Sequence, residues 1–250
     1  MRDMADYERK LTGEDMDFER YQEHFRRNTV KKMIDMYIPE CSSILEIGCG
    51  LKPLFVDYHD EYKFTVVEPA DSFYKNAECL AENYKNVVCY QGFMEDIVEE
   101  MKGCTFDFII CTALLHEVVD PKRLLRVIHS LCSQKTIVHV STLNAFSLHR
   151  LLAKEMGLME DVHQLSETNQ ILQQSAVFDM KSLKQLVSDE HFQILDAGSF
   201  FLKPFSQKQM KQCMDHEILN HDVLDALDSI CSSYMKEYGS EIYLNIQRED

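Results

Sequence analysis

Short runs of apolar residues recur along the chain, and each is long enough for one buried strand. They cover residues 43–47, 64–69, 86–90, 105–111, 135–141, 192–201 and 241–246. Between most of these runs the apolar residues follow a helical period instead. Strands that alternate with helices predict an α/β domain with seven strands, whose mostly parallel sheet carries helices on both faces. The last strand follows a helical region at 206–238 and completes a late hairpin.

Two further segments lie outside this alternation. Residues 1–38 are charged, with apolar side chains at helical spacing, and Pro39 ends the pattern before the first strand. Residues 142–178 begin with a helical stripe and continue as a polar, glutamine-rich stretch. Such a length exceeds a routine connection, and long insertions usually have a function. We therefore expect an N-terminal helical segment at 1–38, a core at 39–141, a helical insert at 142–178 that covers the substrate, and the rest of the core at 179–250.

The composition narrows the class of protein. The 250 residues carry a formal net charge of −16, which opposes binding to nucleic acid and to anionic membranes, since both attract basic surfaces. No run approaches the roughly 18 apolar residues of a membrane span. The nine cysteines contain no C-x-x-C pair, so free thiols in a reducing cytosol explain them best. We expect a cytoplasmic protein that is a monomer or a homodimer.

The most informative stretch follows the first apolar run. Glu46-Ile47-Gly48-Cys49-Gly50 ends a strand and turns on two glycines, which leave room for a ligand beside the main chain. Pro53 suits the start of a helix, but the dinucleotide fingerprint needs a third glycine there, which counts against NAD. Glu68 ends the second strand, 22 residues after Glu46 (68 − 46). A carboxylate in that position can accept both hydroxyls of an adenosine ribose.

Two motifs together resemble the class I S-adenosylmethionine-dependent methyltransferases. Glu46-x-Gly48-x-Gly50 is similar to the family's [D/E]-x-G-x-G-x-G, although Lys52 replaces the last glycine. Leu114-Leu115-His116-Glu117-Val118-Val119-Asp120-Pro121 resembles the string that follows the fourth strand in small-molecule methyltransferases. The resemblance is closest to the group that includes ubiquinone-type and sugar- or natural-product-modifying enzymes. It implies a Rossmann-like fold, S-adenosyl-L-methionine as cofactor, S-adenosyl-L-homocysteine as product, and a lid formed by residues 1–38.

The resemblance also implies cofactor contacts at the carboxyl ends of the strands. In the family, the loop after the third strand holds the adenine between an apolar side chain and a carboxylate. Here Phe93 or Met94 would supply the apolar contact, and Glu95 or Asp96 the acceptor. The expected cofactor-binding residues are Glu46, Gly48, Cys49, Gly50, Glu68, Pro69, Phe93, Met94, Glu95, Thr112 and Leu115.

A sulfonium methyl is already activated, so the protein has to align the acceptor and supply a base where a hydroxyl attacks. His116 follows the fourth strand and is the first candidate for this base, and His149 is the second. Arg150 is a candidate clamp for an anionic group of the substrate, and Tyr21 is a candidate substrate contact. No metal is expected, because His116-Glu117 lacks the second histidine of H-E-x-x-H.

We therefore expect direct transfer of a methyl group to a small-molecule acceptor, at a hydroxyl oxygen rather than nitrogen and without a metal. Methylation of a small amine is the alternative within the family. Two alternatives come from other classes: a non-catalytic scaffold that keeps the fold and the cofactor, which Lys52 favours, and an NAD-dependent oxidoreductase.

Overall fold

A computed structural model describes residues 3–13 and 18–249, and its centre is a seven-stranded sheet in the order β3-β2-β1-β4-β5-β7-β6. The strands are β1 (Ser43–Ile47), β2 (Lys63–Glu68), β3 (Val87–Gln91), β4 (Phe108–Cys111), β5 (Ile137–Leu143), β6 (Phe192–Phe200) and β7 (Glu241–Arg248). Strands β1 to β5 are parallel, whereas β7 runs antiparallel between β5 and β6. The predicted mostly parallel, Rossmann-like α/β fold is confirmed.

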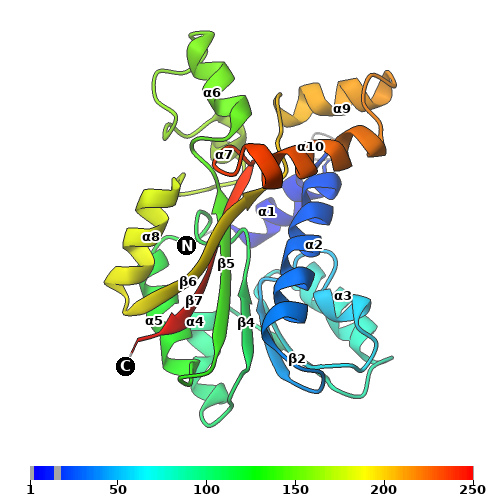
Figure 1. Cartoon of the computed structure of the whole chain (residues 1–250). Coiled ribbons are helices and arrows are strands. Elements are labelled where there is room, and N and C mark those ends of the chain that lie inside the picture. Colours follow the sequence, from blue (N-terminus) through cyan, green and yellow to red (C-terminus); the bar gives the residue numbers. More distant parts are fainter. Residues whose placement is uncertain (1–2, 14–17, 250) are drawn as a thin grey trace.

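Helices cover both faces of this sheet (Figure 1). One face carries α4 (Met94–Ile97), α5 (Pro121–Leu131) and α8 (Met180–Asp189). The other face carries α2 (Glu19–Tyr37) and α3 (Asp71–Ala81). A single 3-10 turn, η3 (Val98–Met101), follows α4.

Alternation along the strands explains why the chain has two core layers. Successive side chains of a strand point to opposite faces of the sheet. Leu45 and Ile109 therefore pack with the residues of α5 and α8, whereas Ile44 and Phe108 pack with those of α2 and α3. All four side chains are fully buried. Because both faces are covered, the parallel strands are nearly continuous apolar runs in the sequence.

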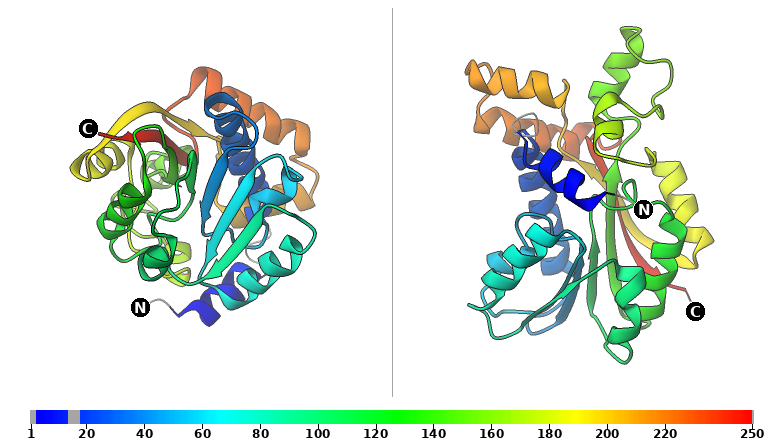
Figure 2. Two further views of the ribbon diagram at one scale, coloured as in Figure 1. Left: turned by 90° about the horizontal axis from the view of Figure 1, so that it is seen from below. Right: turned by 180° about the vertical axis from the view of Figure 1, so that it is seen from behind.

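Several helices lie beyond the carboxyl ends of the parallel strands, at the top of Figure 1. The insert forms α6 (Leu148–Glu155) and α7 (Glu167–Ile171), and the predicted helical region at 206–238 forms α9 (Gln207–Asp215) and α10 (His221–Tyr234). Helix α1 (Met4–Leu11) lies beside the start of α3 (Figure 2), where Oε1 of Glu8 accepts a hydrogen bond from the N–H of Ser72 (3.2 Å). These helices surround the edge at which open α/β sheets bind their ligands.

The structure corrects one expected helix. After Pro53 the chain forms only a 3-10 turn, η2 (Leu54–Asp57), and not a full α-helix. The turn ends at Asp57, because Tyr58 already departs from helical geometry (φ −121°), and His59 then adopts a left-handed conformation (φ 42°) that an α-helix cannot continue.

No helix among the described residues combines the length and the apolar character that a membrane span requires. The nine cysteines all fall within the described ranges and are free thiols.

Candidate active site

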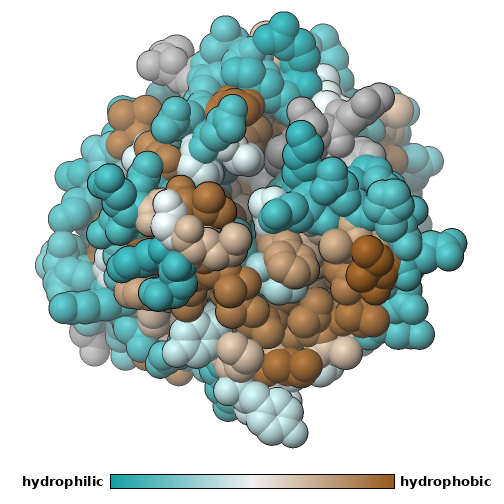
Figure 3. All heavy atoms as spheres, turned by 90° about the horizontal axis from the view of Figure 1, so that it is seen from above, coloured by the Kyte–Doolittle hydropathy of each residue, from teal (hydrophilic) through white to brown (hydrophobic). Residues whose placement is uncertain are grey.

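The carboxyl ends of the parallel strands open into a cavity of about 1460 Å³. Figure 3 looks down on this edge and shows apolar side chains gathered around its hollows. Ten of the eleven expected cofactor residues line the cavity, namely Glu46, Gly48, Cys49, Gly50, Glu68, Pro69, Phe93, Met94, Glu95 and Thr112. The sequence motifs thus mark one continuous wall, which belongs to β1 and β2, to the loops that follow β1, β2, β3 and β4, and to the start of α4.

The glycine loop is fixed by the carboxylate that ends β2. Gly48 and Gly50 have φ angles of 76° and 58°, a backbone region that favours glycine. Oε2 of Glu68 accepts a hydrogen bond from the N–H of Gly50 (3.0 Å), and Oε1 accepts one from the N–H of Ala70 (2.9 Å). Each carboxylate oxygen has a further lone pair, so the group can also accept from ligand hydroxyls. Glu68 is nearly buried, and this burial raises its pKa.

Glu46 ties the glycine loop to the turn that follows it. Its two carboxylate oxygens accept from the N–H of Leu54 (3.2 and 2.9 Å). Burial raises the pKa of Glu46 to about 7. Its side chain lines the cavity and at the same time satisfies a backbone donor of η2.

Lys52 does not disturb this loop. Its backbone φ is not positive, so this position does not require glycine. Its side chain is 56% exposed, and Nζ lies 3.4 Å from Oδ1 of Asp57. Arg27, which also lines the cavity, donates hydrogen bonds to the carbonyl oxygens of Lys52 and Pro53 and to Asp57 (2.9 Å), and these bonds hold the loop. The feature that favoured a non-catalytic scaffold therefore has a structural explanation that leaves the cavity open.

The residues expected to contact the adenine lie in the loop after β3 and in the first turn of α4. Phe93 is half-buried on the cavity wall, whereas Met94 is 2% exposed and packs mainly in the core. Asp96 is exposed and lies 3.9 Å from Arg123. Both acids line the cavity, but Glu95 is half-buried and Asp96 is directed toward Arg123, so Glu95 is the better placed of the two.

Two expected contacts need correction. Leu115 is fully buried in the core cluster behind the cavity wall, because the turn after β4 directs it toward the sheet interior. Tyr21 belongs to an aromatic cluster between α2 and α10, with its ring 5.2 Å from Phe18 and 5.5 Å from His221. Both side chains contribute to packing and are outside the cavity lining.

His116 lies on the cavity wall just after β4 and is 2% exposed. Its Nδ1 is hydrogen-bonded to Oγ1 of Thr142 (3.0 Å), and its Nε2 lies 4.0 Å from Oε1 of Glu117. Its carbonyl oxygen accepts from the N–H of Ser175 (2.8 Å), which links this turn to the end of the insert. The imidazole is therefore held in one orientation at the middle of the cavity edge.

His149 and Arg150 lie at the insert side of the cavity. Burial, together with the charges of Lys203 and Arg150, holds the pKa of His149 well below its usual value, so the ring is neutral. Arg150 donates to the carbonyl oxygens of Val162 (2.8 Å) and Gln164 and to Oδ1 of Asn169 (3.4 Å). Three of the five N–H groups of its guanidinium therefore hold the insert, so Arg150 is less available as a substrate clamp than the sequence suggests.

A buried polar network at the same end was not predicted. Glu241 is fully buried and accepts from Arg26 (2.6 Å) and from Gln22 (2.9 Å). Lys203 donates to Oε1 of Gln22 (3.0 Å), and burial lowers the pKa of Lys203 to about 8. The sequence signal was a lysine that follows the expected strand at 192–201 closely, in Leu202-Lys203-Pro204.

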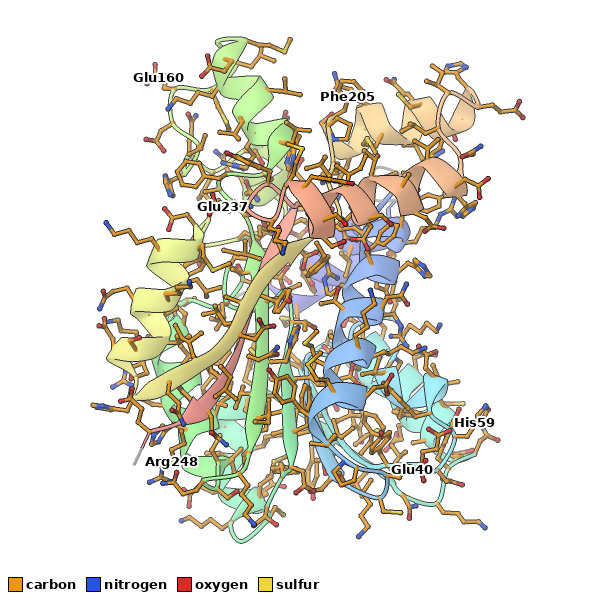
Figure 4. All side chains as sticks on the ribbon, viewed as in Figure 1. Glu40, His59, Glu160, Phe205, Glu237 and Arg248 are labelled. Carbon is orange, nitrogen blue, oxygen red and sulfur yellow. The ribbon has the colours of Figure 1, made fainter. Side chains whose placement is uncertain are left out.

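The mouth of the cavity is apolar. It carries exposed large hydrophobic side chains from α6 and its end and from the chain before α9, namely Leu152, Met156, Leu158 and Phe205. Figure 4 shows Phe205 at the end of α9 that faces the insert. Within residues 3–13 and 18–249, no group of three or more His, Cys, Asp and Glu side chains is arranged to hold a metal ion.

A family model described as a methyltransferase domain matches residues 18–197 of the chain. The chain belongs to this methyltransferase family. Its fold places it among class I methyltransferases, and its cofactor is S-adenosyl-L-methionine. The family and the cofactor predicted from the two motifs are thereby confirmed, and the NAD-dependent alternative is set aside.

Solved structures with the same fold have low sequence identity. The N-methyltransferase NodS from Bradyrhizobium japonicum, in complex with S-adenosyl-L-homocysteine, is 10% identical with a TM-score of 0.58, over 98% of this chain and 97% of that chain. A possible histamine N-methyltransferase from Thermotoga maritima is 17% identical with a TM-score of 0.60, over 98% and 99%. The plantazolicin methyltransferase BamL is 18% identical with a TM-score of 0.59, over 99% and 97%. The sequence has no significant match among curated proteins.

Proposed function

We propose that this methyltransferase acts on a small-molecule acceptor and transfers the methyl group directly to a hydroxyl oxygen. The observation that carries the proposal is the cavity of about 1460 Å³. One ligand typically occupies roughly 300–1,000 Å³, so the volume suits a cofactor and an acceptor together. The net charge of −16 opposes nucleic acid and anionic membranes as acceptors, which favours a free metabolite in the cytoplasm.

The wall at β1 and β2 is the proposed cofactor end. Glu68 would accept from the ribose hydroxyls, and Phe93 and Glu95 would contact the adenine. The main chain at Gly48 to Gly50 would lie along the methionine part, since a glycine loop lets a ligand approach the backbone closely. Bound S-adenosyl-L-methionine supplies a methyl group that is already activated by its sulfonium charge. The protein then has to orient the acceptor and remove its proton.

His116 is the proposed base for the hydroxyl proton. Thr142 fixes its ring through Nδ1 (3.0 Å), and the side chain lies on the cavity wall between the cofactor end and the insert. His149, the second candidate, is a weaker base because burial keeps its pKa low. His149 is better suited to hydrogen-bonding the acceptor than to taking its proton.

A screen of acceptors with a labelled methyl donor tests the proposal. With an acceptor found in this way, His116→Ala should lower kcat by roughly 100-fold or more, since a positioned base contributes about 10²–10⁴. The affinity for S-adenosyl-L-homocysteine should stay within about twofold, because the base acts on the acceptor. His163→Ala is the matched control, since His163 is exposed and bonded to Asp161 and Asp179. Full activity of His116→Ala would exclude His116 from catalysis.

The same screen decides between the alternatives. Two of the similar structures are described as N-methyltransferases or possible N-methyltransferases, which describes those proteins. Hydroxyl and amine acceptors of matched shape should therefore be compared side by side. Turnover of amines alone would replace oxygen by nitrogen as the acceptor atom. Binding of S-adenosyl-L-homocysteine without transfer to any acceptor would favour the non-catalytic alternative.

A further inference from the structure

We propose that the acceptor carries an anionic group, a carboxylate or a phosphate, and that Lys203 binds this group at the end of the cavity beyond the cofactor wall. This inference rests on the methyl-transfer function proposed above and adds the chemical class of the acceptor. Lys203 is preferred to Arg150 as the binding cation because Arg150 uses three of its five donors to hold the insert.

The fold places Lys203 where three segments meet. The N–H of Ser240 donates to the carbonyl oxygen of Phe201 (2.8 Å), which brings the chain before β7 alongside the end of β6. The N–H of Leu148 donates to the carbonyl oxygen of Tyr238 (3.1 Å), which brings the start of α6 to the same place. Lys203 is only 4% exposed, yet its side chain lines the cavity. Its position is therefore set by the scaffold and not by a mobile surface loop.

The ammonium of Lys203 has no carboxylate partner among the described residues. Its strongest charged neighbours come from α2, β7 and α6, and are Glu19, Glu241, Arg26 and Arg150. Together with Lys203 they comprise three cations and two carboxylates, and the nearby ring of His149 is neutral. Both carboxylates are bonded to Arg26 (2.9 and 2.6 Å). The charge of Asp161 acts on Arg150, so Lys203 is the cation that has no carboxylate partner among the described residues, and a buried charge without a counterion is costly.

Several hydrogen-bonding groups at this end also lack partners. Lys203 has three donors, and among the described residues one of them is used, by Oε1 of Gln22 (3.0 Å). Nδ1 of His149 and Oγ of Ser240 are buried and have no hydrogen-bond partner within the described chain. Both residues line the cavity. An oxyanion offers lone pairs to an ammonium, an imidazole and a hydroxyl, and such a ligand accounts for polar groups that are otherwise costly to bury.

The burial of Lys203 makes anion binding depend on pH. Its pKa of about 8 means that the side chain is charged at pH 7 and mostly neutral at pH 9. A bound anion favours the charged form, so binding above pH 8 takes up a proton. The affinity for an anion should therefore fall by about tenfold from pH 7 to pH 9, if Lys203 is the group that binds it.

Calorimetric titration of the protein saturated with S-adenosyl-L-homocysteine tests the inference. The probes are inorganic phosphate and benzoate, with benzamide as the neutral counterpart of benzoate. We expect at least one of the two anions to bind. If benzoate binds, benzamide should bind at least about tenfold more weakly than benzoate, because it carries no charge. Benzoate also serves for the comparison of pH 7 with pH 9, since its own charge is constant there.

Matched variants locate the binding charge. Lys203→Met should lower the affinity for the anion by about tenfold or more, and Lys203→Arg, which keeps the charge, should lower this affinity less. Lys184→Met removes an exposed lysine on α8 and should leave the affinity unchanged. In all three variants the affinity for S-adenosyl-L-homocysteine should stay within about twofold, which also shows that they are folded.

The outcomes separate the two anions and the two proposals. Binding of phosphate alone indicates a phosphorylated acceptor, and binding of benzoate alone indicates a carboxylated one. Absence of binding by either anion to the saturated protein overturns the inference, as does an equal effect of Lys203→Met and Lys184→Met. Failure of the protein to bind S-adenosyl-L-homocysteine in the first place would instead contradict the proposed methyl transfer.

Discussion

The two ends of the cavity are built in different ways. At the cofactor end the contacts are local, since Glu46 binds the backbone 8 residues away and Glu68 binds it 18 residues away. At the acceptor end Gln22 is hydrogen-bonded to Glu241, which is 219 residues away in the sequence, and to Lys203, which is 181 residues away. The cofactor end is thus part of the strand-loop units themselves, whereas the acceptor end exists only when α2, the insert and β6–β7 have packed together. We expect the two ends to respond separately to mutation.

The largest effect should come from breaking the buried ion pair at the acceptor end. Arg26→Met leaves Glu241, which is fully buried, without its main counterion and should lower the free energy of unfolding by about 3–5 kcal/mol. Chemical denaturation measures this loss. The double variant Arg26→Met/Glu241→Gln should recover part of it, because no unpaired charge is left. A loss below about 1 kcal/mol for Arg26→Met would show that the acceptor end does not depend on this pair.

The next effect should be confined to the cofactor end. Glu68→Ala removes the proposed acceptor of two ribose hydroxyls. It should weaken the binding of S-adenosyl-L-homocysteine by about 100-fold, since each charged hydrogen bond contributes about 1.5 kcal/mol. Calorimetric titration measures the change. Glu82→Ala, at an exposed position after α3, is the control and should have no effect. An unchanged affinity in Glu68→Ala would remove the ribose assignment.

The pH dependence of stability should report on Glu46. Its pKa is raised from 4.5 to about 7 in the folded protein, so the folded state holds the proton more tightly than the unfolded chain. Stability from this group is therefore full below pH 4.5 and is lost as the pH rises toward and through 7. Between pH 5 and 7.5 the wild type should lose about 2 kcal/mol more than Glu46→Gln, measured by denaturation at each pH. Parallel curves for the two proteins would contradict this account.

The smallest effect should come from the departure in the glycine motif. Lys52 has no positive φ, and its side chain extends toward Asp57 outside the loop. Lys52→Gly should therefore change the affinity for S-adenosyl-L-homocysteine by less than about twofold. An increase of about tenfold or more in Lys52→Gly would mean that the lysine obstructs the cofactor end.

The contrast between the ends also explains what the sequence could predict. The strands, the glycine loop and Glu68 were predictable because apolar period, glycine placement and chain spacing are local signals. Ten of the eleven expected cofactor residues share the cavity wall for this reason. Leu115 was misplaced because its motif position does not say which way a side chain turns after a strand.

The acceptor end was predicted poorly for a physical reason. Tyr21 and Arg150 have the right chemistry, but tertiary packing uses one in an aromatic cluster and the other in hydrogen bonds to the insert. Lys203 and Glu241 were missed because burial and long-range pairing define them, and neither leaves a periodic pattern in the sequence. The sequence could predict that the site lies at the carboxyl ends of the parallel strands, whereas the identity of the buried charged residues there could be found only from the folded structure.

Titration of S-adenosyl-L-homocysteine into the wild type, Glu68→Ala and Lys203→Met, with NAD as control ligand, tests the central claim most directly. The account predicts micromolar binding to the wild type and to Lys203→Met, binding weakened by about 100-fold in Glu68→Ala, and no binding of NAD. That result would establish a cofactor end that works independently of the acceptor end. Equal loss in Lys203→Met and Glu68→Ala, or no binding to the wild type, would contradict the division of the cavity described above.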